Sequence, residues 1–575
     1  MNMANLVVVK FGSSVLRSEL DLPAAVHEIY RHWREGTKVI AVVSAFGDTT
    51  NQLLRRAENI CKDPEKSALA TLLATGEAAS SALLSLSLTR SGIPARVLDA
   101  VQAGIRTAGG RLEADPIAVD AARLSSEARR AVVVLPGFVG RGESGDTTLL
   151  GRGGSDYSAL FLAQKLGAQC VLLKDVDGLY TSDPACAAGK VPRFSHASYE
   201  TAIRVGGAVV QQKAVRFASA HNLRFSITSI GASCATEIGP GKDELDSSIG
   251  STEPLRVALL GCGTVGSGVY QRLTSLPEHF QVVGVGVRTG ERARAVGVPE
   301  HLLTSKLEAL VEKPCDVVVE LIGGTKRASS LTEWALRLGR DVVSGNKALL
   351  AFKIHDLEEL AIESNAALRY SAAVGGAMPA LETIKTAKKK GRIRSFSGVL
   401  NGTCNLILDR LALGENLTTA VHVAQEEGFA EAHPKFDLNG IDAAQKLVLL
   451  IRAAFDVKLR LESVPRKGIE GLGLQDIKAA QQRGRTVKLI VESRRSAKGA
   501  HASVRPVELP PDHPLAQVRG IENRLIVEME SGERLTAFGK GAGCWPTTEA
   551  VMADLFDLRR SRPITALEEL EECVA

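Results

Sequence analysis

The sequence predicts an α/β protein made of two sheet-based halves. Short apolar segments alternate with helical patterns in both halves, which is typical of a mainly parallel sheet covered by helices. Each half carries a glycine-rich segment, at residues 151–156 and 261–266, and the second directly follows a short apolar strand. A chain of 575 residues with 45% hydrophobic and 23% charged residues has room for about three or four domains.

The first half is expected to be one domain, residues 1–236, with an α/β sheet. Its expected strands are Leu6–Val9, Val39–Val43, Ala131–Leu135, Val171–Leu173 and Phe225–Thr228. Residues 237–253 combine glycine, proline, serine and charged residues without periodic apolar positions. We therefore predict a linker there.

The second half opens with a strand, Leu255–Leu260, and the glycines follow it directly. This strand, turn and helix order predicts a Rossmann dinucleotide-binding domain over residues 254–350. The first glycine permits the tight turn, the second lets the pyrophosphate approach, and the third lets helix and strand pack closely. The expected cofactor contacts in this turn are Gly261, Gly263, Thr264, Val265 and Gly266.

The end of the next strand, Gln281–Val287, bears on the choice of cofactor. An NAD site usually places an acidic residue there, whereas this chain has Arg288. The charge and forked geometry of an arginine suit a 2′-phosphate, so the sequence favours NADP(H) over NAD. The alternative is a solvated arginine at a strand end.

Charge and cysteine content narrow the class of protein. The net charge is +5 with both signs interspersed, and the basic run Lys388–Lys390 lacks aromatic neighbours, so no nucleic-acid partner is expected. Nine scattered cysteines without CxxC spacing indicate reduced thiols and a cytoplasmic location. The N-terminus shows no signal peptide, and Glu77 interrupts the apolar stretch 67–89, so no membrane association is expected either.

Motifs in the first half follow one another in a specific order. Lys10-Phe11-Gly12-Ser13-Ser14 is followed by Thr75-Gly76-Glu77, by residues 147–159 and by residues 175–184. Taken singly, a glycine-rich turn is usually an ordinary loop. Taken together, residues 5 to about 230 resemble the catalytic domain of aspartokinases, which has the amino-acid-kinase fold.

That resemblance implies phosphorylation of aspartate to aspartyl phosphate, with ATP and Mg²⁺. Lys10 would stabilise the transferred phosphate, and Asp156 would organise the site. Aspartate would be bound by Glu77, Arg152 and Ser44. ATP would be contacted by Asp175, Tyr180 and Asp183.

Departures from the aspartokinase pattern leave the kinase activity open. Val209 and Ala185 stand where the family usually has a lysine and an arginine facing ATP. Lys174 and Lys213 are the two candidates to replace this charge. The alternative is a catalytically silent, kinase-like module for assembly or ligand sensing. No separate regulatory domain is recognised before the second half.

In the second half, charged residues cluster before one expected helix, Ile441–Phe455. Asp442 and Lys446 are four residues apart and share a face of that helix. Such a pair is more often a surface salt bridge than a catalytic dyad. Here the surrounding motifs favour catalysis.

Residues 428–446 resemble the substrate-binding signature of homoserine dehydrogenases. Further matching motifs lie at 320–324, 344–351, 374–379, 398–403 and 541–543, so the resemblance covers 255 to about 558. It implies NADP-dependent interconversion of aspartate 4-semialdehyde and homoserine. It also implies an α+β substrate-binding and dimerisation domain over 351–575. The C-terminal segment could belong either to this domain or to the Rossmann domain.

The same resemblance assigns roles to individual residues. Lys446 is the first candidate to donate a proton to the substrate oxygen, with Lys347 at the junction of cofactor and substrate, although Lys347 read alone is an ordinary loop lysine. The substrate amine would be bound by Glu431, Asp437 and Asp442, and the cofactor contacted also by Gly323 and Lys347.

A structural monovalent cation, Na⁺ or K⁺, is the remaining implied ligand. Its backbone ligands would be the carbonyls of Val374, Gly376 and Met378, but Ser371 replaces the usual glutamate. His433 replaces an aspartate of the family pattern and is given no role. The sequence therefore predicts a bifunctional, homo-oligomeric enzyme with small-molecule substrates. The alternative is a homoserine dehydrogenase with a silent kinase-like half.

Overall fold

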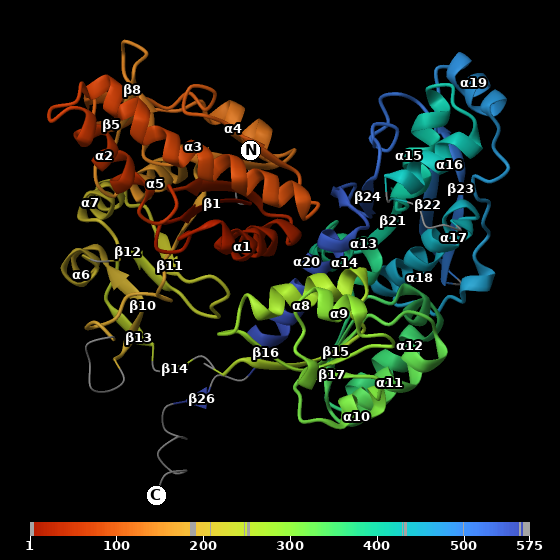
Figure 1. Ribbon diagram of the computed structural model, residues 1–575. Coiled ribbons are helices and arrows are strands. Elements are labelled where there is room, and N and C mark those ends of the chain that lie inside the picture. Colours follow the sequence, from red (N-terminus) through yellow and green to blue (C-terminus); the bar gives the residue numbers. More distant parts are fainter. Residues whose placement is uncertain are drawn as a thin grey trace, which may run out of the picture. The chain divides into compact units, whose positions relative to one another are not determined.

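A computed structural model of the chain divides into two compact units, which Figure 1 shows in red to yellow and in green to blue. It describes residues 5–184, 191–207, 209–246, 248–249, 253–427, 429, 434–497, 499–562 and 565–566. The first unit comprises Met1–Arg90, Pro94–Thr252 and Arg560–Ala575, and the second comprises Ser91–Ile93 and Glu253–Arg559. The α/β prediction is confirmed, because both units are built on strands alternating with helices.

The first unit is organised around a nine-stranded sheet. Its order is β13 (Glu244–Asp246), β10 (Arg193–Ser198), β12 (Thr236–Gly239), β11 (Phe225–Thr228), β9 (Gln169–Leu173), β1 (Leu6–Phe11), β2 (Lys38–Val43), β6 (Val132–Pro136) and β3 (Ala95–Val97). The strands from β11 to β3 pair in parallel. Every residue of β1 is buried, as expected for a central parallel strand covered on both faces.

Helices cover this sheet. Helix α1 (Leu22–Arg34) contacts α3 (Lys66–Arg90), and α5 (Gly154–Leu166) packs against β1 and β9, with α7 (Gln212–Ala220) beside it. By length and composition α3 is apolar enough to cross a membrane, so the sequence-based ground for excluding such a span is wrong. In this unit α3 packs against β6 and buries Leu84 and Leu88 completely.

The segment predicted to be a linker contributes strands instead. Residues 236–239 form β12 between β10 and β11, and residues 244–246 form the edge strand β13. The buried residues of these strands are Thr236, Ile238 and Gly239, of which Ile238 alone has a large apolar side chain, so no apolar periodicity marks the strands in the sequence. Two short strands therefore extend the first unit beyond residue 236.

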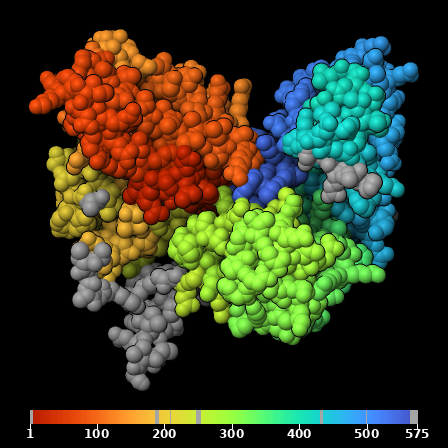
Figure 2. Space-filling view, viewed as in Figure 1, coloured from red at the N-terminus to blue at the C-terminus, as the bar shows by residue number. Residues whose placement is uncertain are grey.

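The second unit begins with a six-stranded parallel sheet. Its order is β17 (Leu303–Thr304), β16 (Phe280–Gly286), β15 (Leu255–Leu260), β18 (Val317–Glu320), β19 (Asp341–Ser344) and β20 (Leu368–Arg369). The order reverses between β15 and β18, the point at which open α/β sheets bind ligands. Both strands are buried except for Arg256. Figure 2 shows the surface of this part of the second unit in green.

A five-stranded antiparallel sheet completes the second unit. Its order is β23 (Gly499–Leu509), β22 (Thr486–Ser496), β21 (Ile393–Val399), β24 (Glu522–Met529) and β25 (Arg534–Lys540). Helix α18 (Ile441–Phe455) packs against β22 and β23. The last helix, α20 (Cys544–Arg560), returns to the parallel sheet: Glu549 forms a buried 2.6 Å ion pair with Arg272, and Phe556 stacks edge-on against Phe280.

Candidate active sites

The glycine turn of the second unit joins β15 to helix α8 (Thr264–Thr274) and has the shape that a bound pyrophosphate requires. Gly261 has a φ of +101°, and a Cβ there would lie 2.7 Å from the Leu321 carbonyl oxygen. A Cβ on Gly266 would lie 2.0 Å from the Gly261 carbonyl oxygen. A Cβ on Gly263 would meet no atom of the described part of the chain within 4 Å, so the open space lies over this glycine.

One cavity of about 670 Å³ extends from this turn along the end of β16. Three exposed arginines line this cavity: Arg288, Arg292 and Arg327. Arg292 donates a 2.9 Å hydrogen bond to Thr264 Oγ1. Sequence reasoning found Arg288 but missed the other two arginines, because Arg292 lies on the short helix α9 (Glu291–Ala295) and Arg327 lies in the first turn of α11 (Lys326–Arg337), after β18.

A second cavity of about 560 Å³ lies on the other side of the glycine turn. Its lining includes Gly263, Thr264, Val265, Gly266, Gly323, Gly324, Asn346, Lys347, Asp437, Asp442 and Gln445. Both cavities share Gly263, Gly323 and Gly324. The glycine turn and the acidic segment before α18, far apart in sequence, thus face one space.

The acid and lysine residues form a closely bonded cluster. Asp442 Oδ1 lies 2.6 Å from Lys347 Nζ, and Asp442 Oδ2 lies 3.0 Å from Lys446 Nζ. Lys446 also donates a 2.7 Å hydrogen bond to the Leu400 carbonyl. The side chain of Lys446 is 6% exposed and lies behind Asp442, whereas that of Lys347 is 44% exposed and lines the cavity.

Asn401 connects the two carboxylates, since its Nδ2 donates to Asp437 Oδ1 at 2.7 Å and to Asp442 Oδ2 at 2.9 Å. Burial raises the pKa of Asp442, but the ammonium groups of Lys446 and Lys347 outweigh it and hold the pKa well below its usual range. Burial and the charge of Asp442 raise the pKa of Asp437. Asp442 therefore stays negatively charged. Asp437 is the carboxylate whose charged form a further cation, such as a substrate ammonium, would stabilise.

Glu320, at the end of β18, holds the loop that carries Lys347. It is fully buried, accepts a 2.7 Å hydrogen bond from Ser344 Oγ and lies 3.3 Å from Asn346 Nδ2. Burial raises the pKa of Glu320. Sequence reasoning gave this residue no role, because its contacts depend on the ends of β18 and β19 lying side by side.

The expected monovalent-cation ligands lie around the short helix α13 (Ser371–Gly375). Val374 and Met378 are buried, Gly376 has a φ of +52°, and the Met378 carbonyl accepts a 2.7 Å hydrogen bond from the Ala380 amide. Ser371 Oγ lies 2.7 Å from Glu382 Oε1 and 2.9 Å from Asp554 Oδ1. Among the described residues, no group of three or more His, Cys, Asp or Glu side chains is placed to hold a metal ion.

The kinase-like site of the first unit centres on Asp156, in the first turn of α5. Asp156 Oδ1 lies 2.6 Å from Lys10 Nζ, and Oδ2 lies 2.8 Å from Lys174 Nζ. Burial raises the pKa of Asp156, but the two ammonium groups outweigh it and leave the pKa lowered. The turn before α5 contains Gly151 and Gly153, both with positive φ.

Glu77 lies beside the loop that follows β2. Its Oε1 accepts a 3.3 Å hydrogen bond from the Ala45 amide, next to Ser44, while its buried Oε2 has no hydrogen-bond partner among the residues that the structure describes. Burial raises the pKa of Glu77 to about 7. An orphaned buried carboxylate oxygen suits a substrate ammonium. Arg152 is exposed on the glycine turn.

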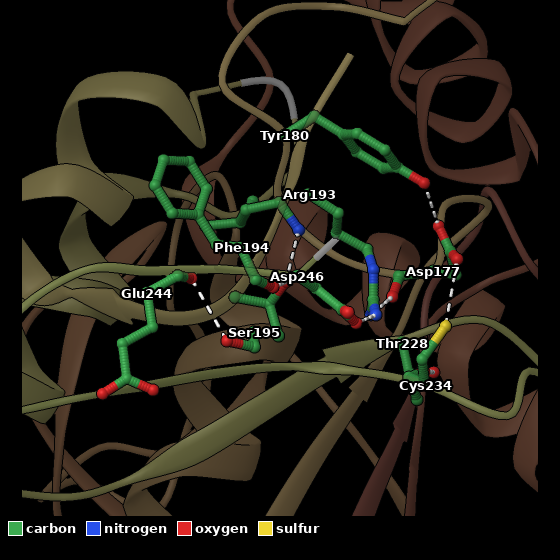
Figure 3. Close-up of polar contacts among 11 residues, drawn as sticks. Asp177, Tyr180, Arg193, Phe194, Ser195, Thr228, Cys234, Glu244 and Asp246 are labelled. Atoms are coloured by element: carbon green, nitrogen blue, oxygen red, sulfur yellow. Dashed lines mark hydrogen bonds and ion pairs between the residues drawn. The ribbon is translucent and has the colours of Figure 1, made fainter. Parts of the chain in front are cut away.

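The expected ATP segment is anchored by a polar network, shown in Figure 3. Asp177 accepts a 2.5 Å hydrogen bond from the Tyr180 hydroxyl and one of 3.4 Å from Cys234 Sγ. Arg193 donates to the Asp177 carbonyl and forms an ion pair with Asp246 of β13. The network thus connects the Tyr180 loop to β13, which lies in the segment predicted to be a linker.

The other expected ATP contacts, Asp175 and Asp183, are exposed along this loop. Ala185, Glu431 and His433 lie outside the described residues.

Comparison with known proteins assigns both units. The amino acid kinase family model matches residues 5–229, the NAD-binding domain of homoserine dehydrogenase matches 261–371, and the homoserine dehydrogenase model matches 379–556. The homoserine dehydrogenase of Corynebacterium glutamicum is 35% identical over 343 residues, which cover 57% of this chain and 75% of that protein. That of Synechocystis sp. is 34% identical over 316 residues, 53% of this chain and 73% of that protein.

A solved structure of a homoserine dehydrogenase from Thiobacillus denitrificans is also similar. It superimposes with a TM-score of 0.51 at 33% identity, covering 55% of this chain and 77% of that one.

Proposed function

Because the chain belongs to the homoserine dehydrogenase family and carries an amino acid kinase family domain before it, we propose a bifunctional enzyme of aspartate metabolism. The second unit interconverts aspartate 4-semialdehyde and homoserine. The first unit phosphorylates the side-chain carboxylate of aspartate with ATP. An enzyme that reduces the acyl phosphate must act between these two reactions, so the fused activities are not consecutive.

One observation carries the dehydrogenase proposal: the glycine turn and the cluster of Asp437, Asp442 and Lys347 line the same cavity. Gly263 leaves room for a pyrophosphate, because a Cβ there would meet no atom of the described residues within 4 Å, whereas a Cβ at Gly261 or Gly266 would collide with the backbone of the turn itself. When bound, the nicotinamide cofactor supplies or accepts the hydride. NADP is favoured over NAD by Arg288, whose exposed guanidinium lines the adjoining cavity.

Within this cavity Asp442 fixes two ammonium groups. When the aldehyde is reduced, negative charge develops on its oxygen, and a positioned ammonium stabilises this charge and then donates a proton. An ammonium has three N–H bonds, and the described contacts of Lys446 use two of them, to Leu400 and Asp442. We assign the third N–H bond of Lys446 to the substrate oxygen. Lys347 lies on the cavity side of Asp442.

Asp437 and Glu431 are proposed to bind the substrate amine. An ammonium beside Asp437 would stabilise a carboxylate that burial and Asp442 disfavour.

The dehydrogenase proposal is tested by NADP-dependent oxidation of homoserine. In Lys446→Ala we expect turnover to fall by about 10³-fold or more, with NADP affinity unchanged, because the residue lies behind Asp442 and away from the glycine turn. Arg452→Ala, at the opposite end of α18, is the control and should retain full turnover. Full turnover in Lys446→Ala would remove this lysine from the mechanism.

For the kinase unit, we propose that Lys10 neutralises the transferring phosphoryl group and that Asp156 positions it. Glu77, Arg152 and Ser44 would bind aspartate, with the orphaned Glu77 Oε2 meeting its ammonium. Asp175, Tyr180 and Asp183 would contact ATP, which enters with Mg²⁺ bound to its phosphates. The rival function is a silent kinase-like module, favoured by Val209 in place of a cation.

Three further proposals complete the account. A Na⁺ or K⁺ ion would be held by the carbonyls of Val374, Gly376 and Met378. This site is supported by the positive φ of Gly376, which turns the backbone here, whereas the hydroxyl of Ser371 is hydrogen-bonded to Glu382.

Reduced cysteines support a cytoplasmic enzyme, since all seven cysteines in the described part of the chain are free thiols. We expect a homo-oligomer, which sedimentation measures directly.

A further inference from the structure

Two buried lysines, not one, face the first turn of α5. Lys10 lies in β1, and Lys174 directly follows β9, the parallel neighbour of β1. Parallel neighbours end at the same edge of a sheet, so both side chains project from that edge toward Asp156. Lys10 Nζ lies 2.6 Å from Asp156 Oδ1, and Lys174 Nζ lies 2.8 Å from Oδ2 and 3.2 Å from Oδ1.

This cluster holds more positive than negative charge. Lys10, Lys174 and Asp156 are 6%, 8% and 3% exposed, and their ion pairs match two ammonium groups with one carboxylate. A buried ammonium without full compensation is costly unless an anion joins it. Burial and Lys10 accordingly lower the pKa of Lys174 to about 8.

The surroundings fit an anion of phosphate type. The glycine turn before α5 places backbone amides of the helix N-terminus next to Asp156, and such amides bind phosphate groups. A Cβ on Gly12 would lie 2.8 Å from Lys10 Nζ, so the absence of a side chain there leaves this ammonium accessible.

Lys213, the other candidate cation, is already neutralised. Its Nζ lies 3.0 Å from Asp115 and 5.1 Å from the centre of the Tyr157 ring, on a side chain that is 36% exposed. A surface pair of this kind offers little charge to a buried phosphate.

We propose that Lys174 is a second phosphate-binding catalytic residue of the kinase site, sharing with Lys10 the negative charge of the transferred group. The proposal rests on the proposed kinase function. In the reaction, an oxygen of the aspartate side-chain carboxylate forms a bond to the γ-phosphorus. The bond from that phosphorus to the bridging oxygen breaks, and its electron pair leaves with ADP. No proton is transferred, so the site must only stabilise charge.

The test uses the full chain in four variants: Lys174→Gln, Lys174→Arg, Lys213→Gln and Lys165→Gln. Lys174→Gln should lower kinase kcat by about 10²-fold and raise the Kd of the ATP analogue AMP-PNP with Mg²⁺ by about tenfold, leaving the KM for aspartate unchanged. Lys174→Arg should restore most of both losses. Homoserine oxidation in the same samples reports that the chain is folded.

Lys165→Gln is the matched control, because Lys165 is exposed at the far end of α5. Unchanged kcat and AMP-PNP affinity in Lys174→Gln would overturn the proposal, as would their loss in Lys213→Gln instead. A wild-type chain that binds AMP-PNP through Lys174 but turns over no aspartate would uphold this residue's role while contradicting the proposed kinase activity.

Discussion

Glu77 shows how one buried carboxylate makes substrate binding depend on pH. Its pKa is raised to about 7 by burial, so the side chain is neutral below pH 7 and charged above it. If it binds the aspartate ammonium, the KM for aspartate should rise about tenfold between pH 8 and pH 6, as the carboxylate is lost. In Glu77→Gln the KM should be high and independent of pH over this range. A pH-independent KM in the wild type would contradict the assignment.

Arg288 carries the expected preference for NADP. In Arg288→Asp, the KM for NADP should rise about tenfold or more while that for NAD changes little, because only the 2′-phosphate loses its partner. Arg292 and Arg327 line the same cavity and supply matched variants. If NADP preference were lost in Arg292→Asp but not in Arg288→Asp, the 2′-phosphate would be bound by Arg292 instead of Arg288.

At the residue scale, the sequence indicated the side chains with local signatures. Asp442 and Lys446 stand four residues apart on one helix and do form an ion pair. Glu320, Asn401 and the Asp442 contact of Lys347 join separate segments, and no spacing within one segment reveals them. Their positions depend on tertiary packing.

The glycine turn is the element on which cofactor binding depends, and two alanine variants separate its roles. Gly266→Ala places a Cβ 2.0 Å from a backbone oxygen. We therefore expect the free energy of unfolding to fall by about 1–3 kcal/mol and NADP binding to be lost as well. In Gly263→Ala the Cβ has no described protein atom within 4 Å, so this variant should weaken NADP binding without lowering thermal stability. Thermal unfolding and NADP titration measure both; equal stability in the two variants would contradict the turn geometry.

Among the elements, those with strong apolar patterns were predictable from sequence. The strand Leu255–Leu260 and the helix Ile441–Phe455 have the bounds expected from their patterns. The strands β12 and β13 were missed, because short strands near a sheet edge bury few side chains and carry no period. Their presence matters for function, since Asp246 of β13 pairs with Arg193 beside the proposed ATP loop.

At the scale of the whole molecule, the chain consists of two units whose proposed active sites share no described residue. The residues that line the dehydrogenase cavity lie between Gly263 and Thr547, in the second unit, and the Lys10, Asp156 and Glu77 site lies in the first. Variants that abolish one activity should therefore leave the other intact. The order of the motifs along the chain already predicted this division, whereas the boundary depended on strands that the sequence did not reveal.

The formation of aspartyl phosphate tests most directly whether one chain carries two chemistries. Hydroxylamine converts this acyl phosphate to a stable hydroxamate, which is measured with the full chain, ATP, Mg²⁺ and aspartate. We predict hydroxamate that requires both ATP and aspartate and is lost in Lys10→Ala, while homoserine oxidation in that variant stays at the wild-type rate. No hydroxamate from a wild-type chain that oxidises homoserine normally would contradict the account and leave the first unit as a silent module.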